Sequence, residues 1–173
     1  MNDIACLTNI KAININGGNT IAIDHYLPHE LLASATDFAE KISICDFLAF
    51  PGFPEWQDKR TKSPILRTGT ISSDPSFDYS YSGEDDGSCV AYEAFSYGGS
   101  SGSPIYAVQK GPKPGVGIEF PGFRPLLCVG INAGHLSVNY KNDGTVIEKA
   151  IDKPHSGITY FYKSTLILDL IDN

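Results

Sequence analysis

The sequence predicts an all-β protein. Its apolar residues fall in many short runs separated by glycine, proline and asparagine, which is the pattern of strands joined by tight turns. Helical periodicity is scarce, and 42% of the 173 residues are hydrophobic, so the strands carry enough apolar surface to enclose a core. Many short strands of this kind close into a barrel or pack as a sandwich, and we expect one of these two architectures.

The expected strands follow one another along the whole chain. They occupy residues 4–7, 11–15, 20–25, 44–50, 65–72, 88–95, 104–108, 126–133, 136–140, 146–151 and 158–162. Residues 16–19 (Asn-Gly-Gly-Asn) and 142–144 (Asn-Asp-Gly) contain the residue types that adopt positive φ in hairpin turns. The Gly- and Pro-rich segment 111–125 is expected to be a long connection within a domain.

Two segments favour helices. Residues 28–39 carry apolar side chains near helical spacing and are expected to form either a short helix or a loop. Near the end of the chain, Ser164 can cap a helix. That helix would place four apolar side chains on one face: Leu166, Ile167, Leu170 and Ile171.

The charge balance limits the classes of partner. A formal net charge of −7 argues against nucleic acid or an anionic membrane as the main partner. No apolar stretch reaches the roughly 18 residues that span a bilayer. Asp3 interrupts the N-terminal segment, which therefore lacks the pattern of a signal peptide. The acidic run at residues 84–87 is expected to be a solvated loop, with a metal or basic substrate as the alternative.

The four cysteines are far apart and form no Cys-x-x-Cys pair. They are Cys6, Cys45, Cys89 and Cys128. Each lies in an apolar, strand-like setting, where a free cysteine behaves as a small buried hydrophobe. We therefore expect no disulfide framework, no zinc site and no other cofactor, and a reducing, cytoplasmic location.

A serine-rich turn, residues 99–104 (Gly-Ser-Ser-Gly-Ser-Pro), is the most informative segment of the sequence. Its glycines let the backbone turn tightly and direct N–H groups inward. Two such N–H groups beside a serine hydroxyl form an oxyanion hole next to a nucleophile. A nucleophile elbow is excluded, because Ser103 replaces the last glycine of that motif and Pro104 leads into a strand instead of a helix.

Four further segments form an ordered set with this turn. They are residues 2–7 (Asn-Asp-Ile-Ala-Cys-Leu), 50–54 (Phe-Pro-Gly-Phe-Pro), 67–71 (Arg-Thr-Gly-Thr-Ile) and 129–134 (Val-Gly-Ile-Asn-Ala-Gly). With these motifs the chain resembles the trypsin-like (chymotrypsin-fold) serine peptidases, especially their bacterial branch with Gly-Asn-Ser-Gly-Ser-Pro. The separation of Asp3 from Ser101 is similar to the Asp-to-Ser separation in that family.

The resemblance implies a double β-barrel. Residues 1–42 would be a remnant of the first barrel and the interbarrel connection, and residues 43–173 the second barrel with the nucleophile and the C-terminal helix. The family's order of His, Asp and Ser places the catalytic histidine upstream of Asp3, and no histidine precedes Asp3 in this sequence. The sequence is therefore expected to be an N-terminally truncated member.

The resemblance also implies a role for each motif residue. Ser101 would be the nucleophile, the N–H groups of Gly99 and Ser101 would form the oxyanion hole, and Asp3 would orient the catalytic imidazole. The alternatives are that Ser101 is a turn residue and that Asp3 is a solvated charge. Three residues would pair with an extended protein or peptide substrate and wall the specificity pocket: Ala133, Gly134 and His135.

Phe95 falls at the position of the aspartate that gives trypsin its preference for basic residues. An aromatic ring cannot neutralise a lysine or arginine, so tryptic specificity is not expected, and Phe95 is equally expected to be a core residue. Small, apolar or acidic preferences stay open, with His135 as a contact for an acidic group.

No histidine of the chain is assigned as the general base. His25, His29 and His155 are expected to be surface residues in turns, and His135 lies on the substrate strand. A serine without a base is a poor nucleophile. Three hypotheses follow: a trypsin-like endopeptidase acting through a Ser101 acyl-enzyme, a catalytically inactive peptide-binding module, and a fragment with exposed apolar surface. The oligomeric state is left open.

Overall fold

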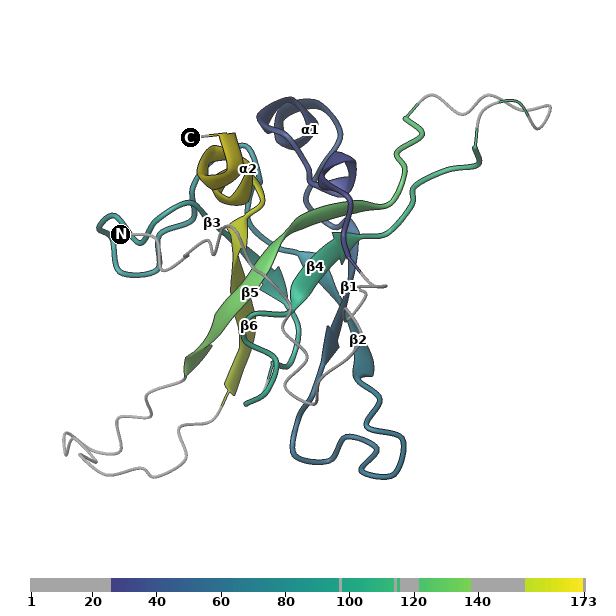
Figure 1. The fold of residues 1–173 in the computed structure, drawn as a ribbon. Coiled ribbons are helices and arrows are strands. Elements are labelled where there is room, and N and C mark those ends of the chain that lie inside the picture. The colour runs from purple at the N-terminus through teal and green to yellow at the C-terminus, as the bar shows by residue number, and fades with distance from the viewer. Residues whose placement is uncertain (1–25, 97, 114, 116–121, 138–154, 173) are drawn as a thin grey trace.

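A computed structural model describes residues 26–96, 98–113, 115, 122–137 and 155–172. Six strands close into an antiparallel barrel in the order β1-β2-β3-β6-β5-β4 (Figure 1). Their bounds are β1 Phe47–Gly52, β2 Ile65–Ile71, β3 Cys89–Glu93, β4 Pro104–Ala107, β5 Leu127–Ser137 and β6 His155–Lys163. Of the two expected all-β architectures, the structure confirms the barrel.

Alternation along the strands fills the barrel with apolar side chains. In β1 and β4 every second residue is buried, which is the pattern of strands with one face inward. Phe50 and Tyr92 meet edge-to-face with ring centroids 5.6 Å apart, and the Phe161 ring lies 5.8 Å from that of Tyr92. All three rings are fully buried in one core cluster. Burying a side chain of this size stabilises a fold by about 1.5–3 kcal/mol.

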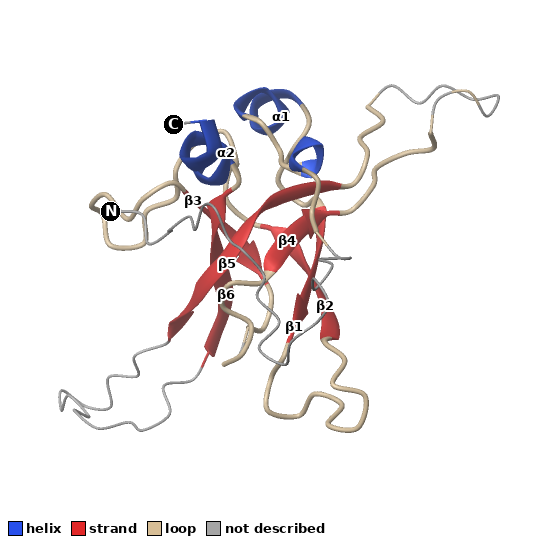
Figure 2. Cartoon of the chain, in the orientation of Figure 1, coloured by secondary structure: helices blue, strands red, loops and turns tan. Residues whose placement is uncertain are grey.

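Short helices cover one end of the barrel, as Figure 2 shows. The segment at residues 28–39 forms a 3₁₀ turn, η1 (His29–Leu31), and a helix, α1 (Ala35–Glu40). Ser34 and Asp37 cap α1 reciprocally, each side chain accepting a hydrogen bond from the other's backbone N–H. The sequence left a helix and a loop open here, and the capping box decides for the helix.

The expected C-terminal helix is present as α2 (Thr165–Asp172), but two details differ from expectation. The Ser164 hydroxyl donates a 2.6 Å hydrogen bond to the Ala33 carbonyl, which links the start of α2 to the segment before α1. The apolar face is also incompletely covered, with Leu170 and Ile171 exposed. Among the described residues, no helix is long and apolar enough to cross a membrane.

Several strand boundaries differ from the sequence prediction, and two of the differences have a clear structural cause. The expected strands at residues 126–133 and 136–140 are joined in β5, which continues to Ser137 because β6 pairs with it along that length. Shifts in the β5–β6 register, after Asn132 and after His135, absorb the irregular Gly-His sequence. The strand expected at residues 44–50 begins later, at Phe47, because Cys45 has a φ of +68°.

The cysteine prediction holds for two of the three described thiols. Cys89 and Cys128 are buried, and burial raises the pKa of each thiol to about 11. The prediction is wrong for Cys45, which is exposed in the turn before β1. The cause is its left-handed backbone conformation, which a strand cannot accommodate.

The acidic run lies in an exposed loop, as expected. Glu84 and Asp85 face solvent, whereas the Asp86 carboxylate accepts hydrogen bonds from Ser80, Tyr81 and Ser82. These bonds lower the pKa of Asp86, the Ser82 backbone bond being the largest cause. No cluster of three metal-ligating side chains occurs within the described part of the chain.

Some predictions fall outside the described residues. They concern Asp3, Cys6, His25, both hairpin turns and the strands expected at residues 4–7, 11–15, 20–25 and 146–151. The barrel and α2 lie within residues 43–173, the range assigned to a second barrel. The division into a first and a second barrel stays a prediction.

Candidate functional site

The serine loop, residues 99–104, leads into β4 at the end of the barrel opposite the helices (Figure 1). Gly99 has a φ of +89° and Gly102 a φ of +81°, conformations that side chains rarely adopt. A methyl group on Gly99 would also overlap the carbonyl oxygen of Phe53 and lie 2.8 Å from its carbonyl carbon. Gly99 is therefore required twice, by its φ and by the close approach of the chain after β1.

Backbone hydrogen bonds fix the serine loop to two neighbouring segments. The Phe53 N–H donates to the Gly99 carbonyl at 2.9 Å. On the other side, the Gly102 N–H donates to the Asn132 carbonyl and the Asn132 N–H donates to the Ser103 carbonyl, both at 2.8 Å. The loop is held at its start by the end of β1 and at its exit by β5.

The Asn132 side chain adds a buried clamp from the barrel interior. Its amide nitrogen donates to the Ser100 carbonyl at 2.8 Å and to Ser96 Oγ at 3.0 Å. Its amide oxygen accepts from the Tyr92 hydroxyl at 2.9 Å. Burial raises the pKa of Tyr92, so this hydroxyl stays protonated and remains a donor. Because the side chains of Asn132 and Tyr92 are buried, losing one partner would leave the other unsatisfied.

Arg67 of β2 reaches the same loop from a third direction. Its Nη1 atom lies 2.9 Å from Ser100 Oγ and 3.2 Å from the Phe95 carbonyl oxygen, and donates to both. Ser100 is completely buried, so its hydroxyl is a fixed internal anchor. Ser100 is therefore not accessible to a ligand, unlike Ser101, which follows it in the loop.

Ser101 is exposed at the tip of the loop. Within the described part of the chain, its hydroxyl makes no hydrogen bond, and neither its N–H nor that of Gly99 donates to another residue. The sequence predicts an oxyanion hole formed by the N–H groups of Gly99 and Ser101, and that role stays a prediction. Neither N–H would have to break a hydrogen bond with a described residue in order to bind a ligand oxygen.

The predicted substrate strand leaves one edge unpaired. β4 pairs with β5 between Leu127 and Ile131, whereas β6 pairs with the opposite edge as far as Ser137. Among the described strands, none pairs with the first edge of β5 beyond Asn132, where Ala133, Gly134 and His135 lie. An extended peptide can pair with such an edge.

Three rings, including that of His135 in this strand, form a cluster. The imidazoles of His135 and His155 lie parallel, with centroids 4.4 Å apart, and the Phe95 ring lies 5.3 Å from His155. Phe95 is 59% exposed, so the interpretation of it as a core residue is wrong: it comes after β3 ends at Glu93 and turns outward.

His155 is not a surface turn residue as expected, but the first residue of β6. Its Nε2 atom accepts a hydrogen bond from the Ser96 N–H at 3.2 Å. Partial burial, with a smaller contribution from His135, lowers the pKa of His155. Among the described residues, no histidine forms a hydrogen bond with Ser101. Asp3 lies outside those residues, so the triad itself stays a prediction.

The roles of several residues were missed at the sequence level. Arg67 and Asn132 were noticed as members of motifs, but no contact with the serine loop was assigned to them. Nothing in the local sequence indicates that Ser96 and Tyr92 hold the serine loop. A buried hydroxyl in a strand-like run is identified only by its hydrogen-bond partner across the barrel. A polar residue inside an otherwise apolar strand, as Asn132 is, was the one available indication.

Comparison with known proteins adds no identification. No family model, no curated protein and no solved structure matches the chain.

Proposed function

We propose that this chain carries the nucleophile and the oxyanion hole of a trypsin-like serine endopeptidase. The observation that supports the proposal is the convergence of three separate motifs on the serine loop. Phe53, Arg67 and Asn132 each belong to a segment for which the resemblance was stated, and each forms hydrogen bonds with residues 99–104. Together they leave the Ser101 hydroxyl accessible.

In the proposed reaction, Ser101 Oγ attacks the carbonyl carbon of a peptide bond and its proton passes to a general base. The negative charge that develops on the carbonyl oxygen is stabilised by the N–H groups of Gly99 and Ser101. The base returns the proton to the leaving amine, which produces an acyl-enzyme on Ser101. Water then hydrolyses the ester and restores the serine.

The base is the component that the described residues do not supply. In the proposed function the base is a histidine outside the described residues, and Asp3 orients it. The experiment therefore uses the whole gene product. A biotinylated fluorophosphonate is added, and the modified residue is mapped by peptide mass spectrometry.

We expect labelling at Ser101, loss of labelling in Ser101→Ala, and retention in the matched variant Ser103→Ala. Ser103 is two residues away in the same loop and contacts Asn132 through its backbone alone, which the substitution keeps. A folded protein without label at Ser101 would overturn the proposal.

The ring cluster supports a substrate preference other than lysine or arginine. Phe95 and the stacked imidazoles of His135 and His155 offer an apolar surface that also carries ring nitrogens. Small, apolar and acidic side chains all suit such a surface, and His135 is the proposed contact for an acidic one. A peptide library should show a changed cleavage preference in His135→Ala and an unchanged one in His29→Ala, since His29 is exposed in η1. Equal preferences in both variants would remove His135 from the proposal.

One observation favours a second function, capture of peptides without turnover. The unpaired edge of β5 can take up an extended peptide whether or not a base is present. The isolated chain should then bind a peptide, lose that binding when the peptide's backbone is N-methylated, and show no fluorophosphonate labelling. Labelling at Ser101 would refute this second function.

A further inference from the structure

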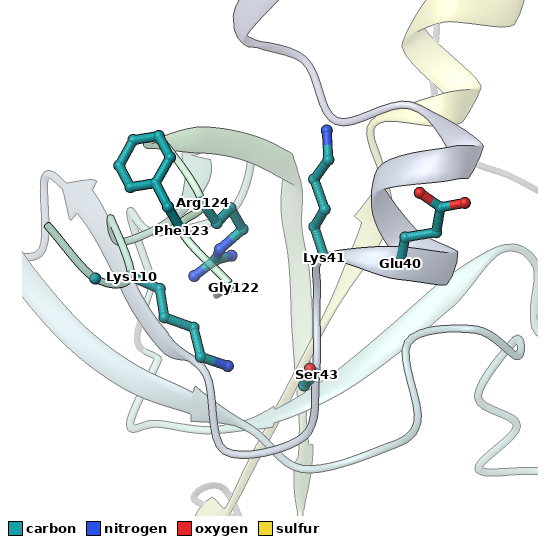
Figure 3. Close-up of a pocket in the computed structure, with 8 residues that line it drawn as sticks. Glu40, Lys41, Ser43, Lys110, Gly122, Phe123 and Arg124 are labelled. Atoms are coloured by element: carbon teal, nitrogen blue, oxygen red, sulfur yellow. The ribbon is translucent and has the colours of Figure 1, made fainter. Parts of the chain in front are cut away.

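A pocket at the helical end of the barrel lies beyond the end of β4 that is opposite the serine loop, and it takes no part in the proposed function. The pocket has a volume of about 490 Å³ and lies between the end of α1 and the connection from β4 to β5 (Figure 3). That size is within the range of small-molecule sites. Three cationic side chains line it: Lys41, Lys110 and Arg124.

Arg124 is the residue that makes this pocket unusual. It is 1% exposed, and it is the largest of the fully buried side chains in the described part of the chain. Its Nη2 atom donates to the Val108 carbonyl at 2.7 Å. Its Nε and Nη1 atoms are also buried, yet neither has a hydrogen-bond partner among the described residues. Leaving two buried guanidinium nitrogens without acceptors is costly, so an acceptor placed beside them would stabilise the folded chain.

The nearest carboxylate does not meet that need. Asp46 Oδ2 lies 3.6 Å from Arg124 Nη1, beyond hydrogen-bond distance, and it accepts instead from the Ser43 N–H at 2.9 Å. Asp46 Oδ1 accepts from Lys110 Nζ at 3.1 Å. One carboxylate is therefore shared between two cations, and the inner wall of the pocket keeps a positive charge.

The remaining charged groups lie toward the rim. Lys41 is paired with Asp37 at 2.7 Å and is about half exposed. In Figure 3 the Glu40 carboxylate is directed away from Arg124. Burial lowers the pKa of Arg124, and attraction from Asp46 acts in the opposite direction. An anion close to the guanidinium would favour its charged form and so offset part of the cost of burying that charge.

We propose that this pocket binds a small oxyanion, a phosphate or carboxylate group, through an unpartnered donor of the Arg124 guanidinium with Lys110 beside it. The chain as a whole has a net charge of −7, so a positive inner wall is a local feature. A neighbouring pocket shares Lys110 and Arg124, but it is also lined by Asp46, whereas the pocket beside α1 is not. The anion would accept one charge-assisted hydrogen bond from the Arg124 guanidinium and another from Lys110 Nζ, and it would neutralise the unshared charge.

The test uses the ¹⁵N-labelled chain and the Nε–H resonance of Arg124, assigned by its absence in Arg124→Lys. Sodium phosphate, sodium acetate and sodium chloride are titrated separately at constant ionic strength. We expect the Arg124 resonance to shift and saturate with phosphate, with acetate or with both, and not with chloride. Saturation with phosphate alone would assign a phosphate group, and saturation with acetate would assign a carboxylate. No saturable shift with either oxyanion would overturn the proposal.

Two lysine variants distinguish binding in the pocket from a general effect of the protein's charge. Lys110→Met removes a half-exposed lysine from the pocket and should weaken oxyanion binding about tenfold. Lys59→Met removes the same charge from an exposed position outside the pocket lining and should change the affinity by less than about twofold. Equal affinities in the two variants would contradict the assignment, whether or not Arg124 variants fold.

Discussion

Two glycines of the serine loop allow two effects on stability to be separated: the close approach of Phe53 and the left-handed backbone conformation. Gly99 and Gly102 are both exposed and both have positive φ, at +89° and +81°. Alanine at either position incurs the cost of a left-handed conformation, about 1–2 kcal/mol. The two sites differ in what the added methyl group meets: backbone of residues 53 and 54 at Gly99, and nothing within 4 Å at Gly102.

We therefore expect Gly102→Ala to lower the free energy of unfolding by about 1–2 kcal/mol. Gly99→Ala should lower it by a further 1–3 kcal/mol or so, because the overlapping atoms belong to backbone and cannot rotate away. Urea unfolding followed by far-UV circular dichroism measures both, and equal m-values would show that the difference lies in the folded state. If both variants lose the same stability, the close contact between Gly99 and Phe53 is refuted.

Three further predictions concern the clamp, the histidine stack and the exposed thiol. Asn132→Ala should lower the free energy of unfolding by about 3 kcal/mol, because three hydrogen bonds of about 1 kcal/mol each are lost. Ser96→Ala removes one of these bonds and should lower it by about 1 kcal/mol. Similar losses of stability in the two variants, measured by chemical denaturation, would refute the clamp. Because the pKa of His155 is lowered on folding, the unfolded chain binds more protons below the ordinary pKa of 6.5, and stability should fall as pH drops from 7.5 to 5. This fall should be smaller in His155→Gln and unchanged in the exposed control His29→Gln, and identical pH profiles would contradict it. Iodoacetamide should modify Cys45 in the native protein well before the two buried cysteines, as mapped by mass spectrometry, and simultaneous modification would show that the folded barrel does not protect them.

The barrel was predictable because its strands are short, apolar and bounded by turn residues, and the position of the serine loop was predictable from its glycines. The sequence also indicated which segments belong together, but not how they meet. Phe53 just after β1, Arg67 in β2 and Asn132 in β5 reach the loop from separate parts of the chain, and these long-range hydrogen bonds leave no periodic signal.

Boundary errors have specific physical causes. β5 appeared as two strands because Gly134 and His135 interrupt the apolar pattern, whereas pairing with β6 carries the strand through them with shifts in register. Cys45 appeared to be a strand residue because local apolarity does not indicate a positive φ.

The pocket around Arg124 was missed for a related reason. Arg124 lies in a segment interpreted as a connection. Its partners are distant in the chain: Asp46 directly precedes β1, and Val108 directly follows β4. A single arginine between prolines gives no indication that its side chain is buried, since that depends on which strands are adjacent in the closed barrel.

The most direct test of the proposed site is a crystal structure of the native gene product after reaction with the fluorophosphonate. We predict a phosphonyl group on Ser101 Oγ, with its oxygen within hydrogen-bond distance of the Gly99 and Ser101 N–H groups. A folded protein without an adduct at Ser101, or an adduct whose oxygen faces away from both N–H groups, would contradict the assignment of Ser101 and its oxyanion hole.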